Sequence, residues 1–312
     1  MKGTRRVNVS VVIVNYKTPK LVKDCVESVV KQTKGVSYEV IVVDNASSDG
    51  SLAAIRNLQH STSNLKLIEN RENLGFAGGN NLGIKQAEGD YVLLLNSDTI
   101  LWEDAISFVV AFMKKHPKVG VASCALVNPD GSLQATGGYF PTLGRVFAWA
   151  LFVDDLPLVG GLLGSYHPHT PKFFTKSRFY TKKRQMDWVT GAFFMIRKEV
   201  IEGLGGLDEE FFMYVEEVEY CFRVKQAGWQ VYYLPEARVV HLGGASTVGS
   251  AGQVMGEFNG LKLFYGKHFP GWREEGLKVA LGVAAGLRWV VFGVMMGKKE
   301  KGEAYAKALA NI

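Results

Sequence analysis

The stretch YVLLLNSD, residues 91–98, runs five apolar residues directly into Asn96, Ser97 and Asp98. An apolar run without alternation predicts a strand that is buried on both faces of a sheet. Asn96 and Asp98 are two positions apart, so their side chains point to one face. Oxygen atoms in this arrangement suit Mg²⁺ or Mn²⁺. A helix cap at Asp98 is the alternative, and this stretch alone does not choose between the two.

Strands and helices alternate on either side of this stretch. Strands are predicted at residues 9–14, 39–43, 65–69, 91–95 and 119–125, and helices at 20–31, 51–59, 79–88 and 102–116. Beyond an irregular stretch at 126–186, which could hold a mobile lid, strands are predicted at 187–197, 230–234 and 238–241, and a helix at 215–227. Strands joined by helices imply an α/β fold with a mainly parallel sheet, whose ligands bind beyond the carboxyl ends of the strands.

The composition is that of a globular protein: 312 residues, 47% of them hydrophobic and 21% charged. The three cysteines are far apart and form no pair, which favours a reducing compartment. No apolar stretch near the N-terminus is long enough for a signal peptide, so we expect a cytoplasmic protein.

Basic residues gather at residues 172–184 and 298–307 of a chain whose formal net charge is +6. Such clusters can bind nucleic acid, anionic lipid or a phosphorylated substrate, and solvated surface is the alternative for each. No nucleic-acid-binding motif accompanies them, so we expect no nucleic acid partner.

The apolar stretch at residues 277–297 includes Lys278 and Arg288. A charge in mid-span is costly in a bilayer. We therefore expect a helix that packs on the protein or lies at a membrane interface, rather than one that spans the membrane.

Two further turns follow predicted strands. Asp44 opens the turn DNASSDG, residues 44–50, and glycines enrich the stretch NLGFAGGNN, residues 73–81. An acidic residue at a strand end can bind a ribose or base, and glycines before a helix let the backbone approach phosphate. A helix cap and a flexible loop are the alternatives. The chain has neither a G-x-G-x-x-G after its first strand nor a P-loop, which argues against a dinucleotide or a P-loop nucleotide site.

Carboxylates lie among large aromatic residues in the stretch LDEEFFMYVEEVE, residues 207–219. Burial near apolar rings raises the pKa of a carboxyl group and makes its carboxylate a better base. Favourable interaction with a helix dipole explains some of the acids but not the aromatic residues beside them. His241 ends a predicted strand and is a candidate metal ligand, although a lone histidine is more often structural.

Together, these ordered motifs resemble the family 2 glycosyltransferases of the GT-A fold, most nearly their bacterial rhamnosyltransferase-like members. The resemblance covers residues 9–244 and rests on VSVVIVNY, VVDNASSDGS, NLGFAGGNN, LLNSD, VTGA, FFMYVEEVE and HLGG. It implies a Rossmann-like, mainly parallel sheet flanked by helices, with a C-terminal helical appendage. It divides the chain into a nucleotide-sugar-binding half at 1–125, an acceptor-binding and catalytic half at 126–250, and a helical segment at 251–312 that could contact membrane.

The resemblance also implies roles for individual residues. The nucleotide would be bound by Asn15, Tyr16, Asp44, Asn45, Ser47, Asn73, Gly75, Phe76, Gly78, Asn80 and Asn96. The metal, Mn²⁺ or Mg²⁺, would be bound by Asp98 and His241. Glu217 would be the general base, with Glu216 as the alternative. The acceptor side would be shaped by Trp188, Thr190 and Gly191.

Two positions depart from the family pattern. Asn96 stands where the family has the first aspartate of its DxD motif, and it carries no charge. Glu217 stands where the family usually has aspartate, and its side chain reaches one methylene farther.

The resemblance implies an inverting transfer of a sugar, with rhamnose as our first expectation, from a nucleoside-diphosphate sugar to a hydroxyl group. The acceptor would be a cell-surface glycan or a lipid-linked glycan at the inner face of the cell membrane. A non-catalytic sugar-nucleotide-binding protein and a nucleotidyltransferase are the alternatives. The first is motivated by Asn96 and Glu217, and the second is disfavoured because no basic, glycine-rich loop follows the first strand.

Overall fold

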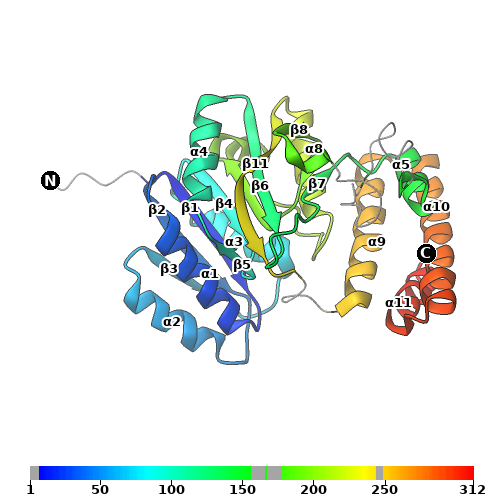
Figure 1. Ribbon diagram of the computed structural model, residues 1–312, viewed down its shortest axis with the longest axis horizontal. Coiled ribbons are helices and arrows are strands. Elements are labelled where there is room, and N and C mark those ends of the chain that lie inside the picture. Colours follow the sequence, from blue (N-terminus) through cyan, green and yellow to red (C-terminus); the bar gives the residue numbers. More distant parts are fainter. Residues whose placement is uncertain (1–6, 156–165, 167–177, 244–248) are drawn as a thin grey trace.

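A computed structural model describes residues 7–155, 166, 178–243 and 249–312. In this part of the chain, a nine-stranded sheet has the order β3-β2-β1-β4-β10-β6-β11-β5, with β8 paired to β11 (Figure 1). Its strands are β1 (Val9–Asn15), β2 (Tyr38–Asp44), β3 (Leu65–Glu69), β4 (Tyr91–Leu95), β5 (Thr99–Leu101), β6 (Val119–Val127), β8 (Arg184–Met186), β10 (Phe193–Arg197) and β11 (Gln230–His241). A short separate ladder pairs β7 (Gly137–Gly138) with β9 (Trp188–Val189).

Both faces of this sheet are buried, because alternate residues of each central strand enter different cores. In β1, Val12 belongs to one core, whereas Val11 and Ile13 belong to the other. The core around Val11 is covered by α1 (Pro19–Gln32), α2 (Ser51–Ser61) and α4 (Ala105–Lys115). The core around Val12 is covered by α3 (Gly75–Lys85), α7 (Lys198–Leu204) and α8 (Glu216–Gln226). Burial on both faces explains the continuous apolar runs of the sequence.

The predicted fold class is confirmed, and the sheet has a parallel and a mixed part. Strands β3, β2, β1 and β4 are parallel to their neighbours. Beyond β4, β10 runs antiparallel to both β4 and β6, while β11 is parallel to β6 and antiparallel to β5 and β8.

Several predicted elements have other bounds in the structure. The strand predicted at 187–197 is interrupted between β9 and β10, and the two strands predicted at 230–241 form one strand with an irregularity between Leu234 and Arg238. The predicted helix at 79–88 begins four residues earlier, at Gly75. Strand β5 and helix α7 were not predicted.

The early start of α3 reflects how closely this helix lies on β1. A methyl group added at Gly79 would lie 2.9 Å from Val14 Cγ1, and one added at Gly83 would overlap Val12. Glycine is a poor helix former, so a stretch as rich in glycine as residues 73–81 looks like a loop in the sequence. These two glycines instead allow the helix to approach the strand.

The C-terminal helices form a group beside the sheet, joined by one helix from the middle of the chain (Figure 1). The group contains α5 (Leu143–Ala150), α9 (Gly249–His268), α10 (Trp272–Arg288), the π-helical segment η3 (Trp289–Met295) and α11 (Lys299–Ala310). Two short 3₁₀ turns, η1 (Val153–Asp155) and η2 (Arg178–Thr181), lie elsewhere in the middle of the chain. The predicted division at 125/126 falls within β6, and the one at 250/251 falls in the first turn of α9.

Arg288, the charge within the apolar C-terminal stretch, is buried inside this group. Its guanidinium donates to the carbonyl oxygens of Trp149 (2.7 Å) and Ala150 (3.1 Å) at the end of α5. It also stacks on the rings of Trp149 and Phe152, 4.1 and 4.3 Å from their centroids. One face of α10 therefore packs on the protein. By length and composition alone, Trp272–Met295 could also cross a membrane.

Candidate active site

The predicted site residues lie at one edge of the sheet. Asn15 and Asp44 end the parallel strands β1 and β2 and are register partners. Asn96 follows β4, and its backbone N–H donates to Ala192 O, just before antiparallel β10 begins. His241 ends β11 opposite Thr99. Residues at the ends of four strands, β1, β2, β4 and β11, thus lie where an open α/β sheet binds its ligands.

Asp44 is buried in a small hydrogen-bonded network. Asn15 Nδ2 donates to Asp44 Oδ1 (2.8 Å) and to Ser47 Oγ (3.1 Å), and the Ser47 N–H donates to Asp44 Oδ2 (3.1 Å). Thr18 Oγ1 donates to Asn15 Oδ1 (2.8 Å) and lies 3.4 Å from Ser97 Oγ, which links this network to the turn that carries Asp98. Asn15 is fully buried and holds Asp44 and Ser47 in place.

Asn45 uses all of its side-chain hydrogen-bonding capacity on the loop before α3. Its amide donates to Asn73 Oδ1 (2.8 Å) and Gly75 O (3.0 Å). Its oxygen accepts from Asn70 Nδ2 (3.1 Å) and from the Leu74 N–H (3.2 Å). Two donors and two acceptor sites are the full complement of an amide, so Asn45 shapes the loop before α3.

Phe76 joins this loop to two other segments of the site. Its N–H donates to Phe212 O (2.7 Å), in the aromatic stretch before α8. A methyl group at Gly191 would lie 3.0 Å from the Phe76 ring, so the predicted acceptor side touches the predicted nucleotide side there. Neither Phe212 nor its contact with Phe76 was among the predicted site residues.

The remaining predicted site residues differ in their exposure and in their hydrogen-bond partners. Tyr16 is exposed, with the Lys17 ammonium 5.0 Å from its ring centroid. Asn80 is buried and donates to Phe76 O within its own helix, beside buried Gly78. On the acceptor side, buried Trp188 donates to Tyr139 O (3.0 Å), and the Thr190 N–H donates to Thr136 O (2.9 Å).

Asp98 and His241 form a pair that suits a divalent cation. His241 Nε2 lies 3.3 Å from Asp98 Oδ1, and the carboxyl group is almost fully buried. Gln134 Oε1 lies 2.8 Å from the other ring nitrogen, Nδ1, and Gln134 Nε2 donates to the backbone oxygen of His241 (2.7 Å). If the Nδ1 proton is donated to Gln134, Nε2 would be the ring nitrogen that could hold a metal beside Asp98. Sequence reasoning missed Gln134, which lies in the irregular stretch with no motif around it.

Glu216 and Glu217 begin α8 in different surroundings. Glu216 is buried, and its Oε2 has no hydrogen-bond partner in the part of the chain that the structure describes. Burial, and then the neighbouring charge of Glu217, raises the pKa of Glu216 well above its ordinary value of 4.5. Glu217 is partly exposed. Of the two candidates, Glu217 is the one whose side chain is accessible to a substrate.

The basic cluster at residues 172–184 is only partly visible, because Lys172 and Lys176 lie outside the described residues. Two of its described members contact aromatic rings. The Lys183 ammonium lies 5.2 Å from the Phe112 ring centroid, and the Arg184 guanidinium lies 4.2 Å from that of Phe179.

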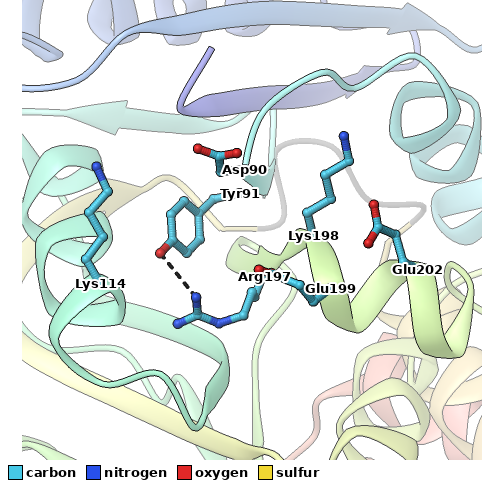
Figure 2. Close-up of a pocket in the computed structure, with 7 residues that line it drawn as sticks. All are labelled: Asp90, Tyr91, Lys114, Arg197, Lys198, Glu199 and Glu202. Carbon is cyan, nitrogen blue, oxygen red and sulfur yellow. Dashed lines mark hydrogen bonds between the residues drawn. The ribbon is translucent and has the colours of Figure 1, made fainter. Parts of the chain in front are cut away.

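A cavity of about 340 Å³ lies at the opposite end of β4 (Figure 2). It is lined by Asp90, Tyr91, Lys114, Arg197, Lys198, Glu199 and Glu202. The guanidinium of Arg197 donates to Tyr91 Oη (3.3 Å), Val119 O (3.0 Å) and Met113 O (2.7 Å). It therefore ties β10 to α4, and the cavity contains none of the predicted site residues.

Comparison with known proteins finds rhamnosyltransferases among the relatives of this chain. A protein of Mycobacterium tuberculosis named N-acetylglucosaminyl-diphospho-decaprenol L-rhamnosyltransferase is 26% identical over 267 residues, which cover 80% of this chain and 81% of that protein. A rhamnosyltransferase of Escherichia coli is 23% identical over 241 residues, covering 75% of this chain and 83% of its own.

A similar fold is found in a mannosyltransferase from Pyrobaculum calidifontis, solved in complex with GDP-Man and Mn²⁺. The TM-score is 0.60 at 18% identity, with 98% of this chain and 87% of that chain covered. The sequence profile described as glycosyl transferase family 2 matches residues 10–205, more than half of this chain. The chain therefore belongs to glycosyl transferase family 2 and is a glycosyltransferase with the GT-A fold.

Proposed function

We propose that the chain transfers a sugar, with rhamnose the first candidate, from a nucleoside-diphosphate donor to a hydroxyl group, with inversion at the anomeric carbon. The observation that carries this proposal is the convergence at one sheet edge of a buried Asp44 network, the Asp98–His241 pair and the segment that leads into Glu217. Rhamnose and a lipid-linked acceptor are proposed because they stand in the name of the M. tuberculosis relative. The binding-protein and nucleotidyltransferase alternatives are not favoured.

We propose that Asp44 and the loop before α3, which Asn45 holds, bind the base and ribose of the donor. The carboxylate of Asp44 keeps acceptor capacity beyond the two hydrogen bonds it receives inside the protein. The diphosphate is placed near the start of α3, because the dipole of a helix favours an anion at its N-terminus. Gly75, at φ +71°, allows the backbone to turn into that helix.

The Asp98–His241 pair fits Mn²⁺ or Mg²⁺. One carboxylate oxygen and one imidazole nitrogen converge to 3.3 Å, and Gln134 fixes the ring. Diphosphate oxygens are the ligands that such ions usually add to one or two protein groups. When bound, the ion would neutralise charge on the departing nucleoside diphosphate. Asn96 is placed beside this pair as a neutral contact for the donor.

Glu217 is the proposed general base. It accepts the proton of the acceptor hydroxyl while that oxygen attacks the anomeric carbon from the face opposite the diphosphate. Glu216 is buried and not accessible to an acceptor hydroxyl, so it is not proposed as the base. Trp188, Thr190 and Gly191 are proposed to line the acceptor side, since Gly191 packs against Phe76.

The test is Glu217→Gln, with Glu202→Gln, at an exposed position of α7, as a matched control. Glu217→Gln should lower turnover by about 10²–10⁴-fold, the usual contribution of a general base. Donor binding, measured by calorimetry with Mn²⁺, should change little, and the control should behave as wild type. Turnover at the wild-type rate in Glu217→Gln would refute the assignment. A thermal-shift screen of nucleotide sugars with and without Mn²⁺ identifies the donor.

We further propose that the chain works in the cytoplasm at the inner face of the membrane, which its C-terminal helices contact. The inner face of α10 is buried through Leu277, Leu281 and Ala284. The outer face is also apolar: Trp272 is 73% exposed, Val279 61% and, beyond α10, Val294 67%. An amphipathic helix would be polar on this side, so an apolar outer face indicates a surface that is covered in use.

The residues after this face favour a lipid surface. Lys298, Lys299 and Lys301 follow η3 and are exposed. Lysines beside exposed tryptophan and valine residues are typical of segments that lie in the headgroup region of anionic membranes.

Flotation with vesicles containing phosphatidylglycerol tests this contact. Val279→Gln with Val294→Gln should reduce binding and leave transfer to a soluble acceptor intact, whereas Lys20→Gln with Lys23→Gln, on α1, should not affect binding. Undiminished binding of the valine variant would contradict the proposed membrane contact.

A further inference from the structure

The four residues before α8 include a strained turn. Tyr214 and Val215 have φ values of +73° and +72°. Residues other than glycine seldom adopt this left-handed conformation, and a β-branched residue such as valine is a clear exception. Such strain persists only where the surrounding structure enforces it, and it often occurs at functional sites.

Two glycines of α9 press on this turn. A methyl group at Gly260 would lie 2.7 Å from both Tyr214 O and Val215 Cγ2, and one at Gly256 would overlap the Tyr214 ring. Only glycine leaves room for these approaches. Gly266, in the same helix, has open space around it, so close contact is not a general property of glycines in α9.

The loop before α3, which we assign to the sugar donor, holds residues 212–215 from another side. The Phe76 N–H donates to Phe212 O (2.7 Å). A methyl group at Gly75 would overlap that carbonyl group. Phe212 is therefore held by the donor loop, and Tyr214 and Val215 are held by α9.

We propose that Gly256 and Gly260 are positioning residues for the base. Val215 immediately precedes α8, so its backbone conformation sets the direction of the first turn, which carries Glu216 and Glu217. By fixing Val215 in the left-handed region, α9 aims Glu217 at the acceptor hydroxyl. This role rests on the proposed function of Glu217 as the base.

Plain helix packing is the alternative explanation of the two glycines. It predicts that a larger residue lowers stability without a selective effect on the chemical step. A positioning role predicts that kcat falls while the donor still binds, because the hydrogen bonds of Asp44 and Asn45 go to the ends of β1 and β2 and to the loop before α3, away from α9. The two explanations therefore differ in the relation between kcat and donor affinity.

The first experiment compares Gly260→Ala with Gly266→Ala, two identical changes in one helix. Gly260→Ala should lower kcat about a hundredfold, as expected when a catalytic group moves by about 1 Å. Its donor KM, and its donor affinity by calorimetry, should stay within about twofold of wild type. Gly266→Ala should match wild type in all three. Equal kcat values for the two variants would overturn the proposal, and so would a Gly260→Ala protein that loses donor affinity in parallel with kcat.

A compensating pair gives a second, independent readout. Gly256→Ala should lower kcat because its methyl group meets the Tyr214 ring, and Tyr214→Ala removes that ring. The double variant should therefore recover to the kcat of Tyr214→Ala alone, which packing elsewhere on α9 would not produce. A double variant as slow as Gly256→Ala would count against the positioning role.

The two proposals fail in different ways. If Glu217→Gln stays active, the base assignment fails. If Glu217→Gln is inactive while Gly260→Ala is unaffected, only the positioning role fails.

Discussion

Replacement of Arg288 by methionine should loosen α5 from the C-terminal helices. The guanidinium is buried and donates to Trp149 O and Ala150 O, at 2.7 and 3.1 Å. A hydrogen bond from a charged group contributes about 1.5–3 kcal/mol. We use the lower end for both bonds, because Trp149 O also accepts from the Phe152 N–H. The expected loss is about 3 kcal/mol in the free energy of unfolding, of the order found when a buried charged group loses its contacts.

The assay is urea unfolding followed by tryptophan fluorescence, with Arg273→Met as the control. Arg273 is exposed, and its guanidinium lies 5.5 Å from the Trp272 ring centroid. The same guanidinium lies 5.6 Å from the Phe269 ring centroid, and an exposed cation–π contact contributes about 0.5–1 kcal/mol, so this variant should lose less than about 2 kcal/mol. Arg288→Lys should fall between the two, because an ammonium group cannot reproduce the planar fork of arginine. Equal losses for Arg288→Met and Arg273→Met would refute the view that Arg288 holds α5.

Two further predictions concern single side chains. Burial raises the pKa of Glu216 above 4.5, so its carboxyl group favours folding fully below that pH and progressively less as the pH rises. Glu216→Gln should therefore gain stability relative to wild type between pH 4.5 and 7, by up to about 1.4 kcal/mol per pH unit, in urea unfolding at several pH values. Gln134→Ala should weaken Mn²⁺-dependent donor binding about 10–100-fold, because His241 loses the partner that orients its ring. Calorimetry with and without Mn²⁺ measures this, and an unchanged affinity would contradict that role.

The sequence predicted the parallel half of the sheet well, since buried strands there are continuous apolar runs separated by stretches with helical periodicity. It did not predict β5, which is three residues long and is set by pairing with the distant end of β11. It also placed the start of α3 too late, because the glycines that allow this helix to lie on Val12 and Val14 look locally like a loop. Both differences come from contacts between residues far apart in the chain.

The same holds for the site. Residues at strand ends could be predicted, because parallel strands bring their carboxyl ends to one edge, and the Asp98–His241 pair follows from that geometry. Gln134 and Phe212 could not, because their importance arises from contacts with His241 and Phe76 that no local pattern encodes. Asn45 was predicted to lie beside the nucleotide. In the structure, all hydrogen-bonding sites of its side chain are used by the loop before α3, so its role is to hold that loop.

The placement of α9 limits how this protein can be recombined with its relatives. This helix touches the turn before Glu216 through Gly256 and Gly260, and it also packs against α10 and α11. A chimera joined just ahead of α9 would replace α10 and α11 together with the glycines that contact the turn before α8. Grafting should succeed only where the incoming helix carries small residues in the same register, because a side chain at either position would meet the turn before α8.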